Sequence, residues 1–165
     1  MVSAIFTWKG VSEPFFVGGS QIKVNSDSYL AHLRDELIPA AESLYPNNDF
    51  TFFQDSAPSH RENKSQAFLK EKLKSRFVKN TEWPPSSPDS NPLDYYFWDR
   101  VQEKVFKDRH CNPFTSTEEL ERRIREVWGE CASNLKEIRK ALKEFLPRLQ
   151  AVESKDGGSI KTIFG

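Results

Sequence analysis

The sequence has few cysteines, no long apolar run and no excess of either charge, and each absence excludes a class of protein. Only Cys111 and Cys131 occur in 165 residues, and neither lies in a CxxC pair. The sequence therefore offers neither a disulfide framework nor a zinc-binding pattern, and it suits a reducing intracellular setting. No apolar stretch approaches the roughly 20 residues of a membrane-spanning helix, and no basic and apolar leader follows Met1. We therefore expect no membrane association.

The balance of charge limits how the chain can meet nucleic acid. Lysine and arginine together number 24, and aspartate and glutamate also number 24, so there is no global positive field. Contact with DNA must come from local patches, and two basic stretches, at residues 70–79 and 136–143, are candidates. Acidic residues interleave both stretches, so a solvated helix face is the more common explanation of each.

The patterning predicts one folded domain of α/β class. Aromatic residues make up 13% of the chain and charged residues 29%, which is typical of a folded protein with a well-solvated surface. Short apolar and aromatic runs next to glycine, proline or asparagine predict strands at residues 3–8, 14–17, 21–24, 50–54 and 77–78. Helical spacing of apolar residues predicts helices at 27–45, with a bend at Pro39, and at 62–74. The second half reads as helical, at 93–106, from Ser116, and at 135–152 with a break near Pro147.

Two carboxylates stand where a fold can hold a side chain rigidly. Asp55 follows an apolar strand, and Asp94 lies in the first turn of a helix behind a proline-rich loop at residues 83–92. Hard divalent cations such as Mg²⁺ prefer carboxylate oxygens, and two such cations can activate a nucleophile and stabilise a leaving oxygen. The structural alternatives are an Asx-turn or a helix cap for Asp55, and a favourable position at the positive end of a helix for Asp94.

The residues around these carboxylates resemble motifs of a known family. Residues 52–60 read Phe-Phe-Gln-Asp-Ser-Ala-Pro-Ser-His, and residues 83–94 read Trp-Pro-Pro-Ser-Ser-Pro-Asp-Ser-Asn-Pro-Leu-Asp. They resemble the QDxAPxH and WPPxSPDxNPx(D/E) motifs around the second and third catalytic carboxylates of mariner-like DNA transposases. Between Asp55 and Asp94 lie 38 residues, a spacing slightly longer than the commonest one in that superfamily. Residues 2–10, 14–17, 148–152 and 157–158 extend the resemblance over essentially the whole chain.

The resemblance implies a fold, a chemistry and a set of site residues. Such transposases have an RNase H-like mixed sheet flanked by helices, in which three acidic residues bind two Mg²⁺ or Mn²⁺ ions and cut and join DNA. Carried over, Asp55 and Asp94 are catalytic metal ligands. Asn91 and the prolines fix how Asp94 enters the site, and Asp89 braces the loop by hydrogen bonds. His60 matches the histidine of the first motif, and it either touches DNA or a metal-bound water or serves as a capping or packing residue.

The resemblance also implies that parts of the family's enzyme lie outside this sequence. In the family the first catalytic aspartate lies on the first, central strand of the sheet, upstream of the segment that matches Val2. Paired helix-turn-helix modules that recognise element ends precede it. We therefore expect residues 1–165 to be a single partial catalytic domain that is N-terminally truncated, with the first central strand missing and a helical C-terminal half. We expect it to be inactive alone, marginally stable or associated, for instance as a homodimer, and nuclear because its substrate is DNA.

Two other functions are compatible with the same residues. One is a non-catalytic module derived from a transposase, which binds nucleic acid or a protein partner and keeps Asp55 and Asp94 as relics or caps. The other is a free-standing RNase H-like nuclease, which ranks last because it also needs the missing aspartate.

Overall fold

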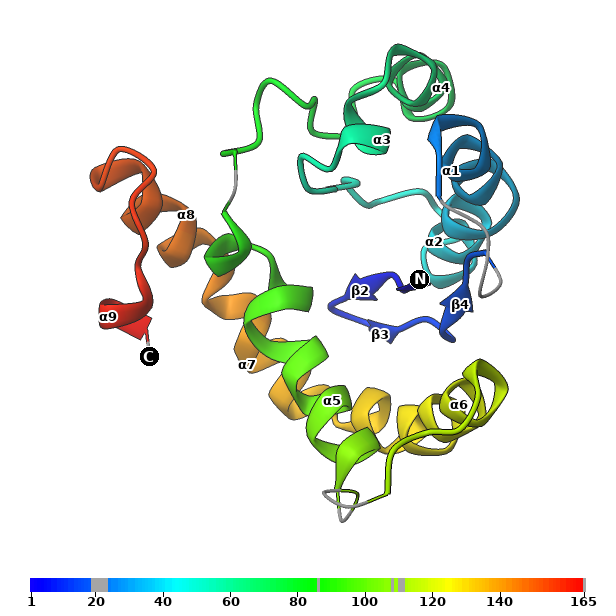
Figure 1. Ribbon diagram of the computed structural model, residues 1–165. Helices are drawn as coiled ribbons and strands as arrows, with labels where there is room; N and C mark the ends of the chain where they lie inside the picture. Colours follow the sequence, from blue (N-terminus) through cyan, green and yellow to red (C-terminus); the bar gives the residue numbers. More distant parts are fainter. Residues whose placement is uncertain (19–23, 86, 108, 110–111, 165) are drawn as a thin grey trace.

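Helices dominate the computed structural model of the chain, which describes residues 1–18, 24–85, 87–107, 109 and 112–164 (Figure 1). The strands are short: β1 (Val2–Ser3), β2 (Phe6–Thr7), β3 (Gly10–Val11) and β4 (Phe15–Phe16). Helical elements of the first half are α1 (Ser26–His32), the π-helical turn η1 (Leu33–Leu37), α2 (Ile38–Leu44), α3 (Pro58–Arg61) and α4 (Asn63–Leu73). Those of the second half are the 3-10 turn η2 (Pro88–Ser90), the π-helical turn η3 (Leu93–Phe97), α5 (Trp98–Phe106), α6 (Thr117–Ser133), α7 (Leu135–Lys143), α8 (Phe145–Ser154) and α9 (Lys161–Phe164).

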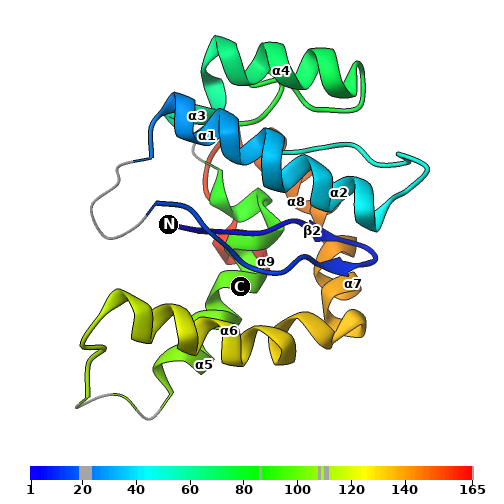
Figure 2. The same cartoon turned by 90° about the vertical axis from the view of Figure 1, so that its right-hand side faces the viewer.

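The N-terminal strands form a central ribbon between two helical layers. Figure 2 shows α1 and α2 running along one side of this ribbon, with α4 beyond them, and α5 and α6 on the other side. The strands predicted at 3–8 and 14–17 are confirmed in part. Ser3 pairs antiparallel with Phe15 in one two-stranded sheet, whereas in the other sheet Phe6 pairs with Val11, which lies outside the predicted strands. The indole nitrogen of Trp128 in α6 donates to the backbone carbonyl of Ser12 over 2.8 Å, which ties the ribbon to the helices on that side.

The described residues form small two-stranded sheets and do not show the predicted mixed central sheet. The strands expected at 50–54 and 77–78 meet only in a single parallel bridge between Phe52 and Phe77. The ribbon and residues 49–55 line one pocket but share no backbone hydrogen bond in the described part of the chain. A segment whose sequence favours a strand forms one only where a neighbouring segment can hydrogen-bond to its backbone. Of the strand expected at 21–24, residues 21–23 lie outside the described residues.

The first long helix follows the prediction, with two differences. It begins at Ser26 rather than at residue 27, and its N-cap is Asn25, whose side chain accepts from the backbone N–H of Ser28 at 2.9 Å. Where a bend was expected at Pro39, the helix instead contains the wider turn η1, in which the N–H of Ile38 bonds to the carbonyl of Leu33, five residues back. Proline cannot complete the regular helical ladder, and this wider turn lies immediately before it.

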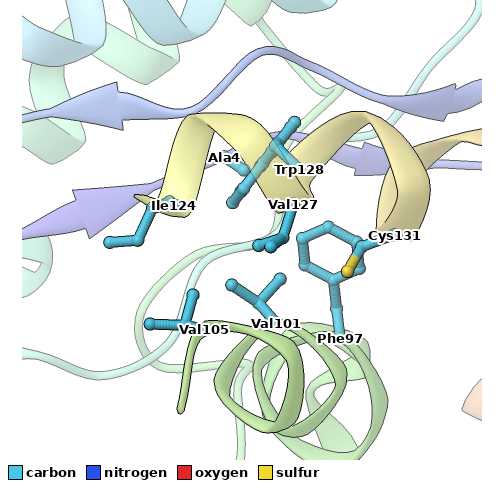
Figure 3. Close-up of a cluster of buried hydrophobic side chains, with 8 residues drawn as sticks. All are labelled: Ala4, Phe97, Val101, Val105, Ile124, Val127, Trp128 and Cys131. Carbon is cyan, nitrogen blue, oxygen red and sulfur yellow. The ribbon is translucent and has the colours of Figure 1, made fainter. Parts of the chain in front are cut away.

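Two separate hydrophobic cores lie on the two sides of the ribbon. The core shown in Figure 3 joins the ribbon, η3, α5 and α6; its buried members are Ala4, Phe97, Val101, Val105, Ile124, Val127, Trp128 and Cys131. The second core joins α1, η1, α2, α4 and the Phe52–Phe77 bridge; its buried members are Tyr29, Leu33, Leu37, Ile38, Phe52, Leu69, Leu73 and Phe77. Cys131 is a buried free thiol in the first core, and Cys111 lies outside the described residues.

The second half is helical, as predicted. Ser116 caps α6 through its side chain, which accepts from the N–H of Glu119. The break expected near Pro147 falls instead at Glu144, so that Pro147 lies in the first turn of α8, where its missing N–H is tolerated. After α8 the chain turns at Gly157, whose φ is +86°. No helix among the described residues is long and apolar enough to cross a membrane.

Candidate functional site

Asp55 and Asp94 meet at one pocket between the two cores. The pocket has a volume of about 460 Å³ and is lined by residues 1–8 and 49–55, among others. His60 and Asn91 line it as well, whereas Asp89 does not. Phe53, Trp83 and Phe145 form an aromatic cluster at the same pocket, with ring centroids 5.2 to 6.3 Å apart. The structure thus brings four of the five predicted site residues together in a largely aromatic setting.

Asp55 is held in place by two donors that share one carboxylate oxygen. The backbone N–H of Ala57 donates to Asp55 Oδ1 over 2.9 Å, which closes an Asx-turn, and His60 Nδ1 lies 2.6 Å from the same oxygen. The pKa of Asp55 is below its usual range, first because of the interaction with His60 and also because of the Ala57 N–H, while partial burial works in the opposite direction. Asp55 is therefore ionised at neutral pH.

His60 is anchored by Tyr29, Gln54 and Gln66. Its ring lies against the ring of Tyr29, with centroids 4.2 Å apart and 30° between the planes. Its backbone carbonyl accepts from the side-chain amides of Gln54, over 3.1 Å, and Gln66, over 2.9 Å. The Tyr29 hydroxyl donates to Gln54 Oε1 over 2.7 Å. Burial and the charge of Asp55 raise the pKa of Tyr29, so its hydroxyl stays protonated. Gln54 belongs to the motif quoted above, but no local signal marks Tyr29.

Asp94 lies in a π-helical turn and has fewer partners than Asp55. It belongs to η3, which follows the proline-rich loop, and Asn91 Oδ1 accepts from the N–H of Leu93 over 3.2 Å. The N-cap position of η3 itself is Pro92, and Asn91 contacts the turn from the residue before it. Burial raises the pKa of Asp94, and the negative charge of Asp55 raises it further, whereas Asn91 opposes the shift. Asp94 is therefore close enough to Asp55 for the charge of Asp55 to affect its pKa.

The loop before Asp94 is clamped by the C-terminal segment. Asp89 Oδ2 accepts from the Ser159 hydroxyl at 3.0 Å and from the Ile160 N–H at 3.1 Å, so Asp89 braces the loop as expected. Arg148, only 7% exposed, donates to the Asp89 carbonyl and pairs with Glu144 at 3.0 Å. The Arg148 guanidinium also lies over the Tyr95 ring, 4.0 Å from its centroid. Arg148 lies in the segment 148–152, which extends the resemblance, but no sequence pattern indicates this role.

The two basic stretches are partly committed to contacts within the chain. Lys72 pairs with Glu42 at 3.0 Å, and Arg76 donates to the Asn48 carbonyl over 2.8 Å. In the second stretch the guanidinium of Arg139 donates to the carbonyl of Trp8. These contacts favour the structural explanation of those side chains over contact with phosphates.

The donors at the pocket suit a hard cation in part. Asp55 and Asp94 offer carboxylate oxygens, and Mg²⁺ is commonly bound by one or two carboxylates together with waters and substrate phosphates. No group of three histidine, cysteine, aspartate or glutamate side chains among the described residues is arranged to hold a metal ion. The pair therefore fits a weak cation site that leaves coordination positions open, and it does not fit a closed structural site.

Comparison with known proteins supports the resemblance seen in the motifs. No family model matches the chain. The chain is 29% identical over 147 residues to "Transposable element Tc3 transposase" from Caenorhabditis elegans, which covers 88% of this chain and 41% of that protein. The chain thus spans about two fifths of the length of this relative. It is a distant homologue of Tc3 transposase, a transposase of the Tc1/mariner family.

Proposed function

We propose that this chain forms part of the catalytic domain of a cut-and-paste DNA transposase, in which Asp55 and Asp94 bind Mg²⁺ or Mn²⁺. The observation that carries the proposal is that two carboxylates, with 38 residues between them in sequence, line one pocket, where the charge of Asp55 raises the pKa of Asp94. The distant relationship to Tc3 transposase supports DNA as the substrate, and a DNA substrate would place the protein in the nucleus.

The electrostatics of the pocket favour a cation between the two carboxylates. Asp55 is stabilised as an anion by His60 and Ala57, while the ionisation of Asp94 is disfavoured by burial and by Asp55. Like charges near each other in a partly desolvated pocket repel more strongly than they would in water. A divalent cation would remove this repulsion and lower the pKa of Asp94, so binding of the metal and ionisation of Asp94 would reinforce each other.

The residues of this chain would position the reaction, and the metal ions would supply its electrophilic chemistry. Bound Mg²⁺ or Mn²⁺ activates a nucleophile and stabilises the leaving oxygen of a phosphodiester. Asp55 is fixed by its Asx-turn and His60, and Asp94 is fixed by η3 and the loop clamp. The aromatic cluster at the pocket would restrict the access of water to that site. Waters, DNA phosphates or a further carboxylate would complete the coordination shell.

We further propose that the fold around the site is RNase H-like. Of the described residues, Ala4 in the ribbon and Thr51 and Phe53 beside the pocket have no backbone hydrogen bond. Unpaired strand edges are an energetic liability that proteins normally cover. One further extended strand between the ribbon and residues 50–54 would pair both edges and would turn them into one continuous sheet. Such a strand could also carry another carboxylate to the pocket.

A second candidate function is a non-catalytic module that binds DNA or a protein. The observation that favours it is the Asx-turn of Asp55, which gives this carboxylate a structural role without any metal. It predicts that removal of the carboxylates changes the stability of the fold but not the binding of metal.

Measurement of Mn²⁺ binding to the whole chain separates the two functions. Electron paramagnetic resonance of free Mn²⁺ gives the affinity of the wild type, Asp55→Asn and Asp94→Asn, with Asp99→Asn as a matched control because Asp99 is exposed on α5. We expect each site variant to lose about tenfold or more in affinity and the control to be unchanged. Equal affinity in all four proteins would exclude the metal site and favour the second function.

A DNA assay complements the metal titration. We expect residues 1–165 alone to give no Mg²⁺- or Mn²⁺-dependent nicking of supercoiled DNA, because two carboxylates leave a two-metal site short of protein ligands. Nicking that requires both Asp55 and Asp94 would contradict this expectation and would show that the pair is sufficient for cleavage.

A further inference from the structure

The two oxygens of the Asp55 carboxylate have different surroundings. Oδ1 accepts the N–H of Ala57 at 2.9 Å and lies 2.6 Å from His60 Nδ1. Among the described residues, no donor lies within hydrogen-bonding distance of Oδ2. One oxygen is thus occupied by the protein itself, and the other remains available at the pocket that Asp94 also lines.

The position of the His60 ring fixes which of its nitrogens carries the proton. Nδ1 lies 2.6 Å from Asp55 Oδ1 and 3.3 Å from the Asp55 backbone carbonyl oxygen. Both atoms only accept hydrogen bonds, so Nδ1 carries a hydrogen whether the ring is neutral or charged. His60 therefore acts toward Asp55 as a donor, and its Nδ1 is not free to bind a metal.

His60 is also rigid enough to hold another side chain in place. The Tyr29 ring that packs against it is only 3% exposed and belongs to the second core. The carbonyl of His60 is fixed by the amides of Gln54 and Gln66, and Gln54 is fixed in turn by the Tyr29 hydroxyl. A donor with so little freedom can select one rotamer of the carboxylate that it contacts.

We propose that His60 is a positioning residue that makes Asp55 a one-oxygen ligand: the His60 Nδ1–H and the Ala57 N–H hold Oδ1, and only Oδ2 is presented to a cation shared with Asp94. This inference rests on the proposed metal site and adds the way in which Asp55 binds. With Oδ1 occupied, both oxygens of Asp55 cannot chelate one ion. Coordination positions therefore stay open for phosphate oxygens and waters, which a reaction on DNA requires.

Two substitutions of His60 separate positioning from general stability. In His60→Asn the side-chain NH₂ falls near the place of Nδ1 and can still donate to Asp55 Oδ1, whereas in His60→Gln it extends toward the place of Nε2. The two variants have similar polarity and differ by one methylene group. We expect His60→Asn to keep its Mn²⁺ affinity within about threefold of wild type, and His60→Gln and His60→Ala to lose about tenfold.

A third variant tests the other donor without changing the ring. Ala57 has φ −55° and ψ 148°, which proline can adopt, so Ala57→Pro removes one N–H donor and leaves the backbone direction intact. We expect it to weaken Mn²⁺ binding as well. Asn63→Gln, at an exposed position in α4, is the matched control and should bind Mn²⁺ as the wild type does.

The outcomes distinguish this inference from the proposed function on which it rests. Mn²⁺ affinity is measured by electron paramagnetic resonance, and thermal unfolding without metal is recorded for every variant. Loss of affinity in His60→Gln with retention in His60→Asn, at similar melting temperatures, supports the positioning role. Equal affinities of the two variants, or affinities that follow melting temperature alone, overturn it. If Asp55→Asn and Asp94→Asn also leave binding unchanged, the metal site itself is excluded.

Discussion

The two halves of the pocket hold their carboxylates by different means. Asp55 has two donors on one oxygen, and its pKa lies below the usual range. Asp94 lies in a π-helical turn, and burial and the charge of Asp55 raise its pKa, although the side chain of Asn91 opposes the shift. The protein itself thus stabilises the Asp55 anion, whereas burial and the charge of Asp55 disfavour the ionisation of Asp94. We infer that the charge of Asp55 depends little on a bound cation, whereas a bound cation would favour the ionisation of Asp94.

The contacts that hold the two carboxylates also differ in how far apart in sequence their partners lie. Asp55 is held within its own motif by Ala57 and His60, and Tyr29 supplies the further anchor. Asp94 depends on the distant C-terminal segment, because Arg148 and Ile160 hold the loop that precedes it. Changes far from the pocket should therefore disturb Asp94 more than Asp55.

The largest expected effect comes from removal of the clamp on the Asp94 side. Arg148→Met removes a buried guanidinium that pairs with Glu144, donates to the Asp89 carbonyl and lies between two aromatic rings. We expect a loss of about 2–4 kcal/mol in the free energy of unfolding, measured by urea titration. The exposed ion pair of Arg122 with Glu126 provides the control, since Arg122→Met should change stability by less than about 0.5 kcal/mol.

The same variant shows whether the clamp serves Asp94 in particular. We expect faster amide hydrogen exchange in η2 and η3 of Arg148→Met than in wild type, with α1 and α4 less affected. Equal acceleration on both sides of the pocket would mean that the clamp stabilises the molecule as a whole.

Replacement of each carboxylate by its amide should have opposite effects on stability. Asp55 has a folded-state pKa below its unfolded value, so its charge stabilises the fold at neutral pH, and this contribution is lost as pH falls through the folded pKa. Asp94 has a folded-state pKa above its unfolded value, so its contribution is present at low pH and is lost as pH rises through the folded pKa. At pH 7 we expect Asp55→Asn to be less stable than wild type and Asp94→Asn to be more stable.

Both of these differences should stay below about 1 kcal/mol, because each group is partly exposed and screened by solvent. Urea titrations at pH 7 and at about pH 3 measure them. The difference in the free energy of unfolding between the two variants should become smaller at the lower pH, where Asp94 is protonated. Shifts of the same sign at neutral pH would contradict the contrast between the two halves.

The smallest expected effect is an acid sensitivity confined to the Asp55 side. His32 is buried in α1, and burial lowers its pKa, although Glu36 opposes the shift. Because the folded pKa lies below the unfolded value of about 6.5, stability is lost as pH falls below that value. The buried residues of the core around Trp128 include no histidine. Between pH 7 and 5, hydrogen exchange corrected for intrinsic rates should accelerate more in α1 than in α6, and His32→Gln should remove the difference.

Local sequence patterns predicted the helices well and the sheet poorly. The cap at Ser116 and the helix that contains Pro39 follow from neighbouring residues alone. Strand pairing depends on partners far away in sequence, and residues 50–54, although apolar and aromatic, have only the bridge between Phe52 and Phe77. The apolar character of a segment shows that it can form a strand, but it does not show which other segment will pair with it.

The site could be predicted from its motifs but not in its detail. Asp55, Asp94, His60 and Asn91 were nominated from sequence, and all four line one pocket. Tyr29 and Arg148 could not be found in this way, because each acts on residues more than 20 positions away through contacts that leave no spacing pattern. Nor could the sequence predict that Asp55 Oδ1 has two hydrogen-bond partners while Oδ2 has none among the described residues, because this depends on the three-dimensional structure.

Carbon-13 NMR of the aspartate carboxyl groups during a Mg²⁺ titration tests most directly whether Asp55 and Asp94 share a cation. We predict that the resonances of both shift with the same half-saturating concentration, while that of exposed Asp99 does not. In Asp55→Asn the Mg²⁺-dependent shift of Asp94 should be lost at the concentrations that saturate the wild type. A Mg²⁺ response of Asp94 that is the same with and without the Asp55 carboxylate would contradict the shared site.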